Sequence, residues 1–128
     1  MDKGHEEWLK QSEYDIKTAE AMFVAKRYIY VVFMCHLSIE KSLKGLYQKK
    51  LEKLPPKVHN LLFLIETVGL KLPDNLYEAV FSLNRASIPT RYPEDLKKMQ
   101  KDYPKRITET LLVQSKEVLK WLKKELKK

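Results

Sequence analysis

The sequence predicts an all-α fold, an antiparallel up-and-down bundle of four main helices plus a shorter fifth. Three observations support this prediction. Apolar residues recur at intervals of three and four over long stretches, which is the spacing of one face of an α-helix. The chain has only three glycines, too few for a turn-rich β-fold. No segment of useful length alternates apolar and polar residues as a half-buried strand does. At 128 residues, the chain is expected to form a single domain, residues 1–128, with its own core.

The first helix is expected over roughly residues 6–26 and the second over roughly residues 30–50. Arg27 and Tyr28 leave only a short connection, so these two helices should form an antiparallel pair. The first apolar face carries Trp8, Ser12, Ile16, Ala19 and Phe23, and the second carries Val32, Cys35, Ile39, Leu43 and Leu46.

Prolines divide the remainder of the chain. Pro55 and Pro56 end the second helix, because proline disfavours the helical conformation in the residue before it. A third helix is expected to begin near His59 or Asn60 and to end at Gly69, which suits a helix C-cap.

A fourth helix is expected to begin near Pro73 or Asp74, with an inward face of Leu76, Tyr77, Val80, Phe81 and Leu83. Residues 87–93 contain two prolines and are expected to be irregular. Residues 94–103 are polar and receive no assignment. The last helix is expected over residues 104–126, with a stripe of Ile107, Leu111, Val118 and Leu122.

The net charge is +8, and most of the excess lies late in the chain. The lysines and arginines concerned are Lys97, Lys98, Lys101, Lys105, Arg106, Lys116, Lys120, Lys123, Lys124, Lys127 and Lys128. This excess fits nucleic acid or phosphate as a partner. It equally fits a solvated helix face in a Lys- and Glu-rich protein. Of the aromatic residues, only Tyr103 and Trp121 fall among these basic stretches, which is few for stacking platforms.

Several chemistries lack support in the sequence. Three isolated glycines cannot make a glycine-rich phosphate loop, and one cysteine with three separated histidines is not a metal-ligand pattern. No cofactor or metal is therefore expected, and Cys35 is interpreted as a buried apolar residue. The longest apolar run, residues 29–35, is too short to cross a bilayer, and the N-terminus does not resemble a signal peptide. The expectation is a cytoplasmic protein with no membrane partner.

In the second helix, polar and ionisable residues occupy positions where buried apolar residues are expected. His36 lies inside its apolar arc, and Glu40 lies at the edge of that arc beside Phe33. A buried carboxylate is costly unless it is paired, so Glu40 should have a partner, and a paired buried acid often marks a site. Lys44 is four residues further on and can pair with Glu40 along the helix. Asp15 also points toward the core side of its helix.

Arg91 is the strongest single candidate for a binding residue. It lies between prolines, and its planar guanidinium can donate two parallel hydrogen bonds to a phosphate or carboxylate. The alternative is that Arg91 pairs with Asp15 or Glu40 and fixes the loop. His36 could equally be a core histidine with its hydrogen bonds satisfied, and His59 could cap the third helix or hold a loop.

The order of these residues resembles that of the HEPN domain family. The pattern comprises Trp8, Asp15, His36-x3-Glu40-Lys41-x2-Lys44, His59-Asn-Leu and Ile88-Pro-Thr-Arg91-Tyr92-Pro93. The resemblance spans nearly the whole chain. It implies an antiparallel helical bundle, commonly a homodimer, with a nucleotide-binding role. It also implies a partner, because many small relatives are encoded beside a minimal nucleotidyltransferase and form a toxin–antitoxin-like pair with it.

Two features depart from the family pattern. Ribonuclease branches resemble one another in an arginine followed four to six residues later by a histidine, and none of Arg27, Arg85, Arg91 and Arg106 has a histidine at that spacing. This argues against RNA cleavage. Related chains often carry a tyrosine four residues before the arginine of Arg-Tyr-Pro, where this chain has Ser87.

Three functions remain open. The first is a non-catalytic module that binds a nucleotide, an RNA phosphate or a nucleotidyltransferase partner. Arg91 would then hold the anionic group with help from Lys44, while Glu40 and Asp15 would orient these cations or contact a base or ribose. His36 and His59 are further candidates for this site. The second is a dimeric interaction protein with no small ligand, and the third is an atypical ribonuclease.

Overall fold

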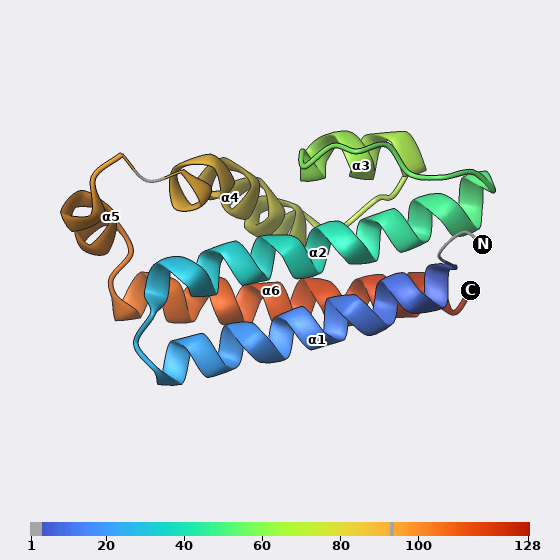
Figure 1. Ribbon diagram of the computed structural model, residues 1–128. Coiled ribbons are helices and arrows are strands. Elements are labelled where there is room, and N and C mark those ends of the chain that lie inside the picture. Colours follow the sequence, from blue (N-terminus) through green and yellow to red (C-terminus); the bar gives the residue numbers. More distant parts are fainter. Residues whose placement is uncertain (1–3, 93) are drawn as a thin grey trace.

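The computed structural model describes residues 4–92 and 94–128. Within these residues the helices are α1 (His5–Val24), α2 (Tyr28–Leu51), α3 (Leu61–Val68), α4 (Asp74–Arg91), α5 (Leu96–Asp102) and α6 (Lys105–Leu126). The four long helices, α1, α2, α4 and α6, alternate in direction, and the two termini lie at the same end of the molecule (Figure 1). The predicted all-α bundle is confirmed, with two short helices, α3 and α5, where one was expected.

Helix α2 is the centre of the bundle, because it contacts each of the other helices. The fully buried side chains include Ile39, Leu43 and Leu46 from α2, Leu61 and Leu64 from α3, Val80 from α4, and Leu122 from α6. The described helices include none with both the length and the apolar character needed to cross a membrane.

Small residues bring α1 and α2 close together. The Ser12 hydroxyl donates to the Ser38 carbonyl at 2.7 Å, and the Ser38 hydroxyl donates to the Ser12 carbonyl at 2.8 Å. A Cβ atom on Gly45 would lie 3.1 Å from the Trp8 Cβ, so only glycine fits this crossing without a shift. The predicted antiparallel pair therefore packs through polar and small side chains as well as apolar ones.

The prediction that residues 87–93 are irregular is wrong for the part that the structure describes. Helix α4 continues through Pro89 to Arg91. Pro89 has no N–H to donate to the carbonyl four residues earlier, so one intrahelical hydrogen bond is lost while the helix continues. Hydroxyl groups in the same turns donate to other carbonyls of the helix. The Ser87 hydroxyl donates to the Asn84 carbonyl and the Thr90 hydroxyl donates to the Ala86 carbonyl, each at 2.7 Å. Arg91 therefore occupies the last turn of a helix and not a loop, while residue 93 lies outside the described residues.

The inward faces predicted for two helices are partly wrong. Val80 and Leu83 of α4 are buried, but Tyr77 and Phe81 are 41% and 47% exposed. In α6, Ile107 is also exposed, whereas Leu111, Val118 and Leu122 are buried as predicted. These exposed residues lie at the edge of an apolar stripe, where the sequence period alone does not distinguish a core position from a surface position.

Residues 96–102, which received no assignment from the sequence, form α5. The Asp95 side chain caps this helix by accepting from the Lys98 backbone N–H, and Met99 is buried beneath it. Helix α5 contacts α2 and closes the end of the bundle at which α1 joins α2 (Figure 1).

Candidate functional site

Glu40 is buried in the middle of α2 and is contacted from several directions. Its Oε2 accepts a hydrogen bond from Lys44 Nζ at 3.1 Å, and its Oε1 lies 2.9 Å from His59 Nδ1. The Nδ1 atom of His36 lies 3.7 Å from the same Oε1. The prediction that Glu40 needs a partner is correct, since it has Lys44 on its own helix and His59 from the loop before α3.

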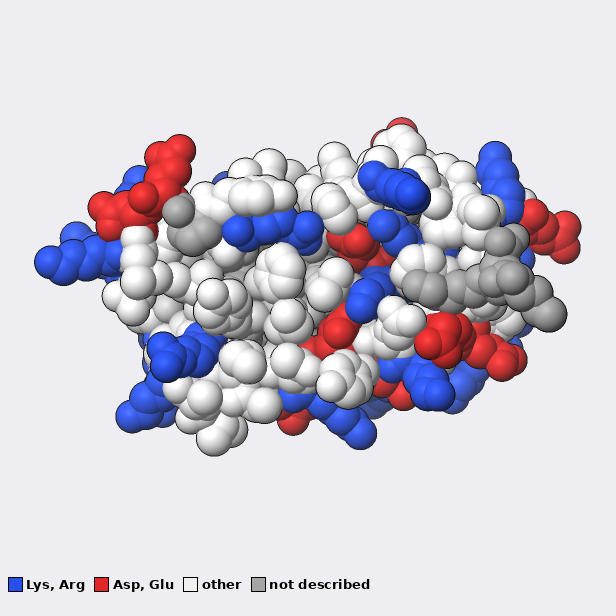
Figure 2. Space-filling view, in the orientation of Figure 1, with Lys and Arg blue, Asp and Glu red and all other residues white. Residues whose placement is uncertain are grey.

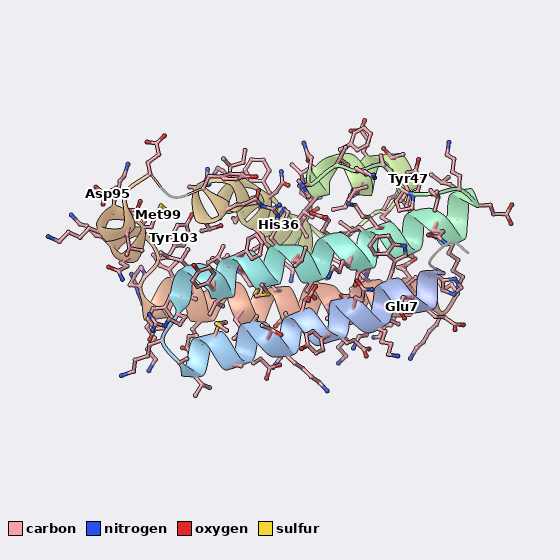
Figure 3. The ribbon with its side chains drawn as sticks, viewed as in Figure 1. Glu7, His36, Tyr47, Asp95, Met99 and Tyr103 are labelled. Carbon is pink, nitrogen blue, oxygen red and sulfur yellow. The ribbon has the colours of Figure 1, made fainter. Side chains whose placement is uncertain are left out.

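The spacing along α2 explains this cluster. Phe33, His36, Glu40 and Lys44 follow one another at three- or four-residue intervals and so share one face of the helix. His36 marks this face midway along α2, on the side toward α3 and α4 (Figure 3). On the surface, acidic and basic atoms lie next to one another over the middle of α2 (Figure 2).

The start of α3 holds His59 against this face. The Asn60 side chain accepts from the backbone N–H groups of Leu62 and Phe63, which makes Asn60 the N-cap. The Asn84 side chain of α4 accepts from the Leu61 N–H at 2.7 Å. Asn60, and not His59, is therefore the N-cap of α3. His59 precedes this cap, and its ring bonds Glu40 instead.

His36 is completely buried and its ring is neutral near neutral pH. Burial lowers the pKa of His36 to about 4; the Glu40 carboxylate opposes this shift and the nearby Arg91 charge adds to it. Neither ring nitrogen has a hydrogen-bond partner of good geometry among the described residues, although the His59 backbone lies close enough to favour the protonated ring. A neutral His36 does not neutralise Glu40 and cannot attract an anion by charge.

Arg91 lies near this cluster but does not pair with its carboxylate. The guanidinium carbon is 4.8 Å from the centroid of the Phe33 ring, a cation–π contact. The side chain is half-buried, and its Nη2 atom is buried without a hydrogen-bond partner among the described residues. The alternative that Arg91 pairs with Asp15 or Glu40 is therefore not what the structure has.

Asp15 lies apart from this cluster. Its Oδ2 forms an ion pair with Lys41 Nζ at 2.9 Å, which joins α1 to α2. The structure thus brings Glu40, Lys44, His36 and His59 together with Arg91 nearby, and it gives Asp15 a different partner. Sequence reasoning missed the role of Phe33 as the support for Arg91, although its position seven residues before Glu40 places both on the same face.

The charges of the cluster do not balance. Glu40 is matched by Lys44, and Arg91 adds a second cation that no described carboxylate pairs. Among the described residues, this cluster included, no three His, Cys, Asp or Glu side chains are grouped as a metal site requires.

The sequence matches the HEPN domain over residues 5–126, nearly its whole length. The chain belongs to the HEPN family. The HEPN fold is also seen in similar solved structures. The archaeal HEPN homologue ST0689 is 23% identical, with a TM-score of 0.78 over 98% of this chain and 99% of that one. The protein TT1696 from Thermus thermophilus is 23% identical, with a TM-score of 0.81 over 94% of this chain and 96% of that one. At this identity they establish the shared HEPN fold alone. None of the curated proteins matches this HEPN chain.

Proposed function

We propose that this HEPN domain is a non-catalytic binding module that holds an anionic group of a nucleotide or nucleic acid at Arg91. The proposal is supported by the state of the Arg91 guanidinium, which forms no ion pair among the described residues. It lies over the Phe33 ring, and its Nη2 atom is buried without a hydrogen-bond partner among those residues. A buried donor without an acceptor costs about 1–3 kcal/mol. A phosphate bound to the half-buried guanidinium would neutralise its charge, which makes phosphate binding favourable here.

The other members of the cluster have supporting roles in this proposal. Glu40 would repel an approaching phosphate, but Lys44 neutralises it and His59 bonds it. The His59 side chain is 59% exposed, so with Nδ1 against Glu40 its ring can also contact a bound nucleotide. His36 is completely buried within the cluster, and its ring stays neutral. Asp15 is left out of the proposed site because it pairs with Lys41.

The absence of catalysis is part of the proposal. The arginine–histidine spacing of the ribonuclease branches is missing from the sequence, and the one histidine in the interior of the cluster is neutral. Incubation of the protein with total RNA, with and without a chelator, tests this point directly. RNA fragments that appear with the wild type but not with a mock preparation would contradict it.

Titration calorimetry tests the binding site. ATP, GTP and a short RNA are titrated into the wild type, Arg91→Ala, Arg91→Lys and the control Lys10→Ala, which removes a cation from the exposed surface of α1. Binding of ATP and GTP should be lost in Arg91→Ala, weakened in Arg91→Lys because lysine cannot donate as a fork, and unchanged in Lys10→Ala. Equal heats for the wild type and Arg91→Ala would remove Arg91 from the site.

A second role, in self-association, is favoured by one face of α4. Large apolar side chains recur along it at spacings of four and seven residues and are exposed in the single chain: Tyr77, Phe81, Ile88 and, at the C-cap, Tyr92. Phe63 of α3 is exposed as well. We infer that a second copy of the chain covers this face, in keeping with the homodimer expected from the sequence.

The partnership with a minimal nucleotidyltransferase is also a proposal. It is supported by the resemblance of the sequence to small HEPN proteins that form such pairs. Co-purification with the product of the neighbouring reading frame tests it, and a neighbour unrelated to nucleotidyltransferases would contradict it.

A further inference from the structure

Two clefts adjoin at the end of the bundle where α1 joins α2 and α5 joins α6. One, of about 690 Å³, lies between α4 and α6, and its lining includes Arg85, Arg106 and Tyr103. The other, of about 550 Å³, lies between the α1–α2 connection and the start of α6, and Tyr103 also lines it. Each volume is within the range of small-ligand sites. Tyr103 lines both clefts, so they adjoin at this residue, and together they are treated as one surface.

The charge of this surface has one sign. Its cations are Arg85, Arg106, Lys26, Arg27 and Lys105, and none of the described residues that line either cleft is an aspartate or glutamate. Burial and the nearby Asp102 raise the pKa of the Tyr103 hydroxyl, and the nearby Arg85 opposes this shift. Basic atoms gather at the lower corner of this end, near the α1–α2 connection (Figure 2), while Asp95 lies at the outer end of α5 (Figure 3).

Two helix starts add to this positive field. Helices α2 and α6 both begin at the second cleft, at Tyr28 and Lys105. Over the described residues, neither helix has a side-chain cap or an acidic residue in its first turn. Free backbone N–H groups at a helix start favour an anion. They reinforce the five cations, which are the main feature of the surface.

Aromatic rings lie among these cations. The sequence showed Tyr103 beside the late basic stretch, and the fold brings Tyr28 and Tyr30 from the start of α2 to the same cleft. Tyr30 is 58% exposed, so its ring is accessible. Figure 3 shows Tyr103 between α5 and the bundle, at the junction of the clefts. Tyrosine rings alternating with lysine and arginine are what stacked bases and a phosphate backbone require.

We propose that a single-stranded polynucleotide, RNA or DNA, binds across these two clefts, with its phosphates on the five cations and its bases on Tyr30 and Tyr103. This surface shares no residue with the Arg91 cluster, so it stands whether or not Arg91 binds a nucleotide. An acidic protein would also be attracted by the charge, but it would not need the rings. A double-stranded segment cannot place its bases on them.

Fluorescence anisotropy with labelled oligo-U and oligo-dT, and with a duplex of equal length, tests the proposal. The double variant Arg85→Ala/Arg106→Ala should weaken oligonucleotide binding by about tenfold or more and make its affinity less dependent on salt. The matched control Lys120→Ala/Lys124→Ala removes the same charge from the exposed surface of the other half of α6. Its affinity should stay within about twofold of the wild type, apart from the general effect of net charge.

The aromatic part of the proposal has its own variants. Tyr30→Ala, at an exposed position, should weaken binding by about tenfold, and Tyr30→Phe should restore it, because the ring and not the hydroxyl stacks. Tyr103→Leu tests the junction, provided that its melting temperature matches the wild type. Arg85→Ala/Arg106→Ala should leave the heats of ATP and GTP titration unchanged, which separates this surface from the proposed nucleotide site.

Three results would overturn the proposal. One is an equal loss of affinity in the cleft variant and the α6 control, which would indicate diffuse charge. Another is binding of the duplex as tight as that of the single strands. The third is displacement of the oligonucleotide by poly-glutamate at the same concentration as by unlabelled oligonucleotide, which would indicate an acidic protein as the partner. The oligo-U and oligo-dT series distinguish RNA from DNA.

Discussion

The guanidinium of Arg91 lies 4.8 Å from the centre of the Phe33 ring, so the last turn of α4 is held on the face of α2 that carries Glu40. This contact places a cation beside the acidic cluster without pairing it to the carboxylate. Because Lys44 already neutralises Glu40, the charge of Arg91 is left for another group. The contact also explains how a residue two positions after Pro89 is kept in place.

Arg91→Ala should change the stability only slightly. The substitution removes a cation–π contact worth about 0.5–1 kcal/mol, but it also removes a buried donor that has no acceptor among the described residues. Urea unfolding should therefore show a free energy of unfolding within about 1 kcal/mol of the wild type. A much larger loss would indicate that Arg91 is a structural residue, and it would favour the interaction protein without a small ligand.

Glu40→Gln should be strongly destabilising. The change leaves the buried Lys44 ammonium without its anion, and breaking one side of a buried pair costs about 3–5 kcal/mol. The matched control is Glu13→Gln, which breaks the more exposed pair with Lys123 and should cost about 0–1 kcal/mol. Equal unfolding midpoints for the two variants would argue against the role of Glu40 as the centre of the cluster.

His36 should make the protein sensitive to mild acid. Its pKa is about 4 in the folded chain against 6.5 for an ordinary histidine, so the unfolded chain takes up a proton first as the pH falls. The contribution of His36 to the free energy of unfolding is fully present above pH 6.5. It is lost as the pH falls toward 4, by about 3 kcal/mol in total. His36→Leu should flatten the unfolding free energy over this interval. If the unfolding free energy of His36→Leu falls with pH as steeply as that of the wild type, other groups cause the acid sensitivity.

Gly45→Ala should destabilise the bundle even though alanine favours helix formation. The new methyl group would lie 3.1 Å from the Trp8 Cβ and 3.3 Å from the His5 carbonyl oxygen, neither of which is the end of a flexible side chain. Helix α1 must move away from α2, at a cost of about 1–3 kcal/mol, which outweighs a helix-propensity gain of about 1 kcal/mol. Thermal melting measures the difference, and a melting point at or above the wild type would contradict this close crossing.

Phe81→Glu should convert the proposed homodimer to a monomer. The residue is exposed on the apolar face of α4, so a carboxylate there is harmless to the single chain and costly in an interface. Light scattering at micromolar concentration measures the mass. Val113→Glu, at an exposed position on α6, is the control and should leave the mass unchanged. A monomeric wild type would remove this proposal.

The sequence alone predicted the features that depend only on residues close together in the chain. Helical periodicity predicted the long helices, and the four-residue spacing of Glu40 and Lys44 predicted their ion pair, because one helix fixes both positions. The same reasoning failed at Pro89, because helix α4 continues through this proline to Arg91. It also failed for the exposed side of α4, since a period shows which residues share a face but not how much of that face is covered.

Only the tertiary structure decided which partners come from other elements. His59 reaches Glu40, Arg91 rests on Phe33, and Asp15 pairs with Lys41, all across loops or between helices. The tyrosines at the start of α2 likewise meet the basic residues of α6 only through the fold. Sequence spacing fixes neighbours within a helix, whereas contacts between helices depend on how the helices pack, and that is set by the whole core at once.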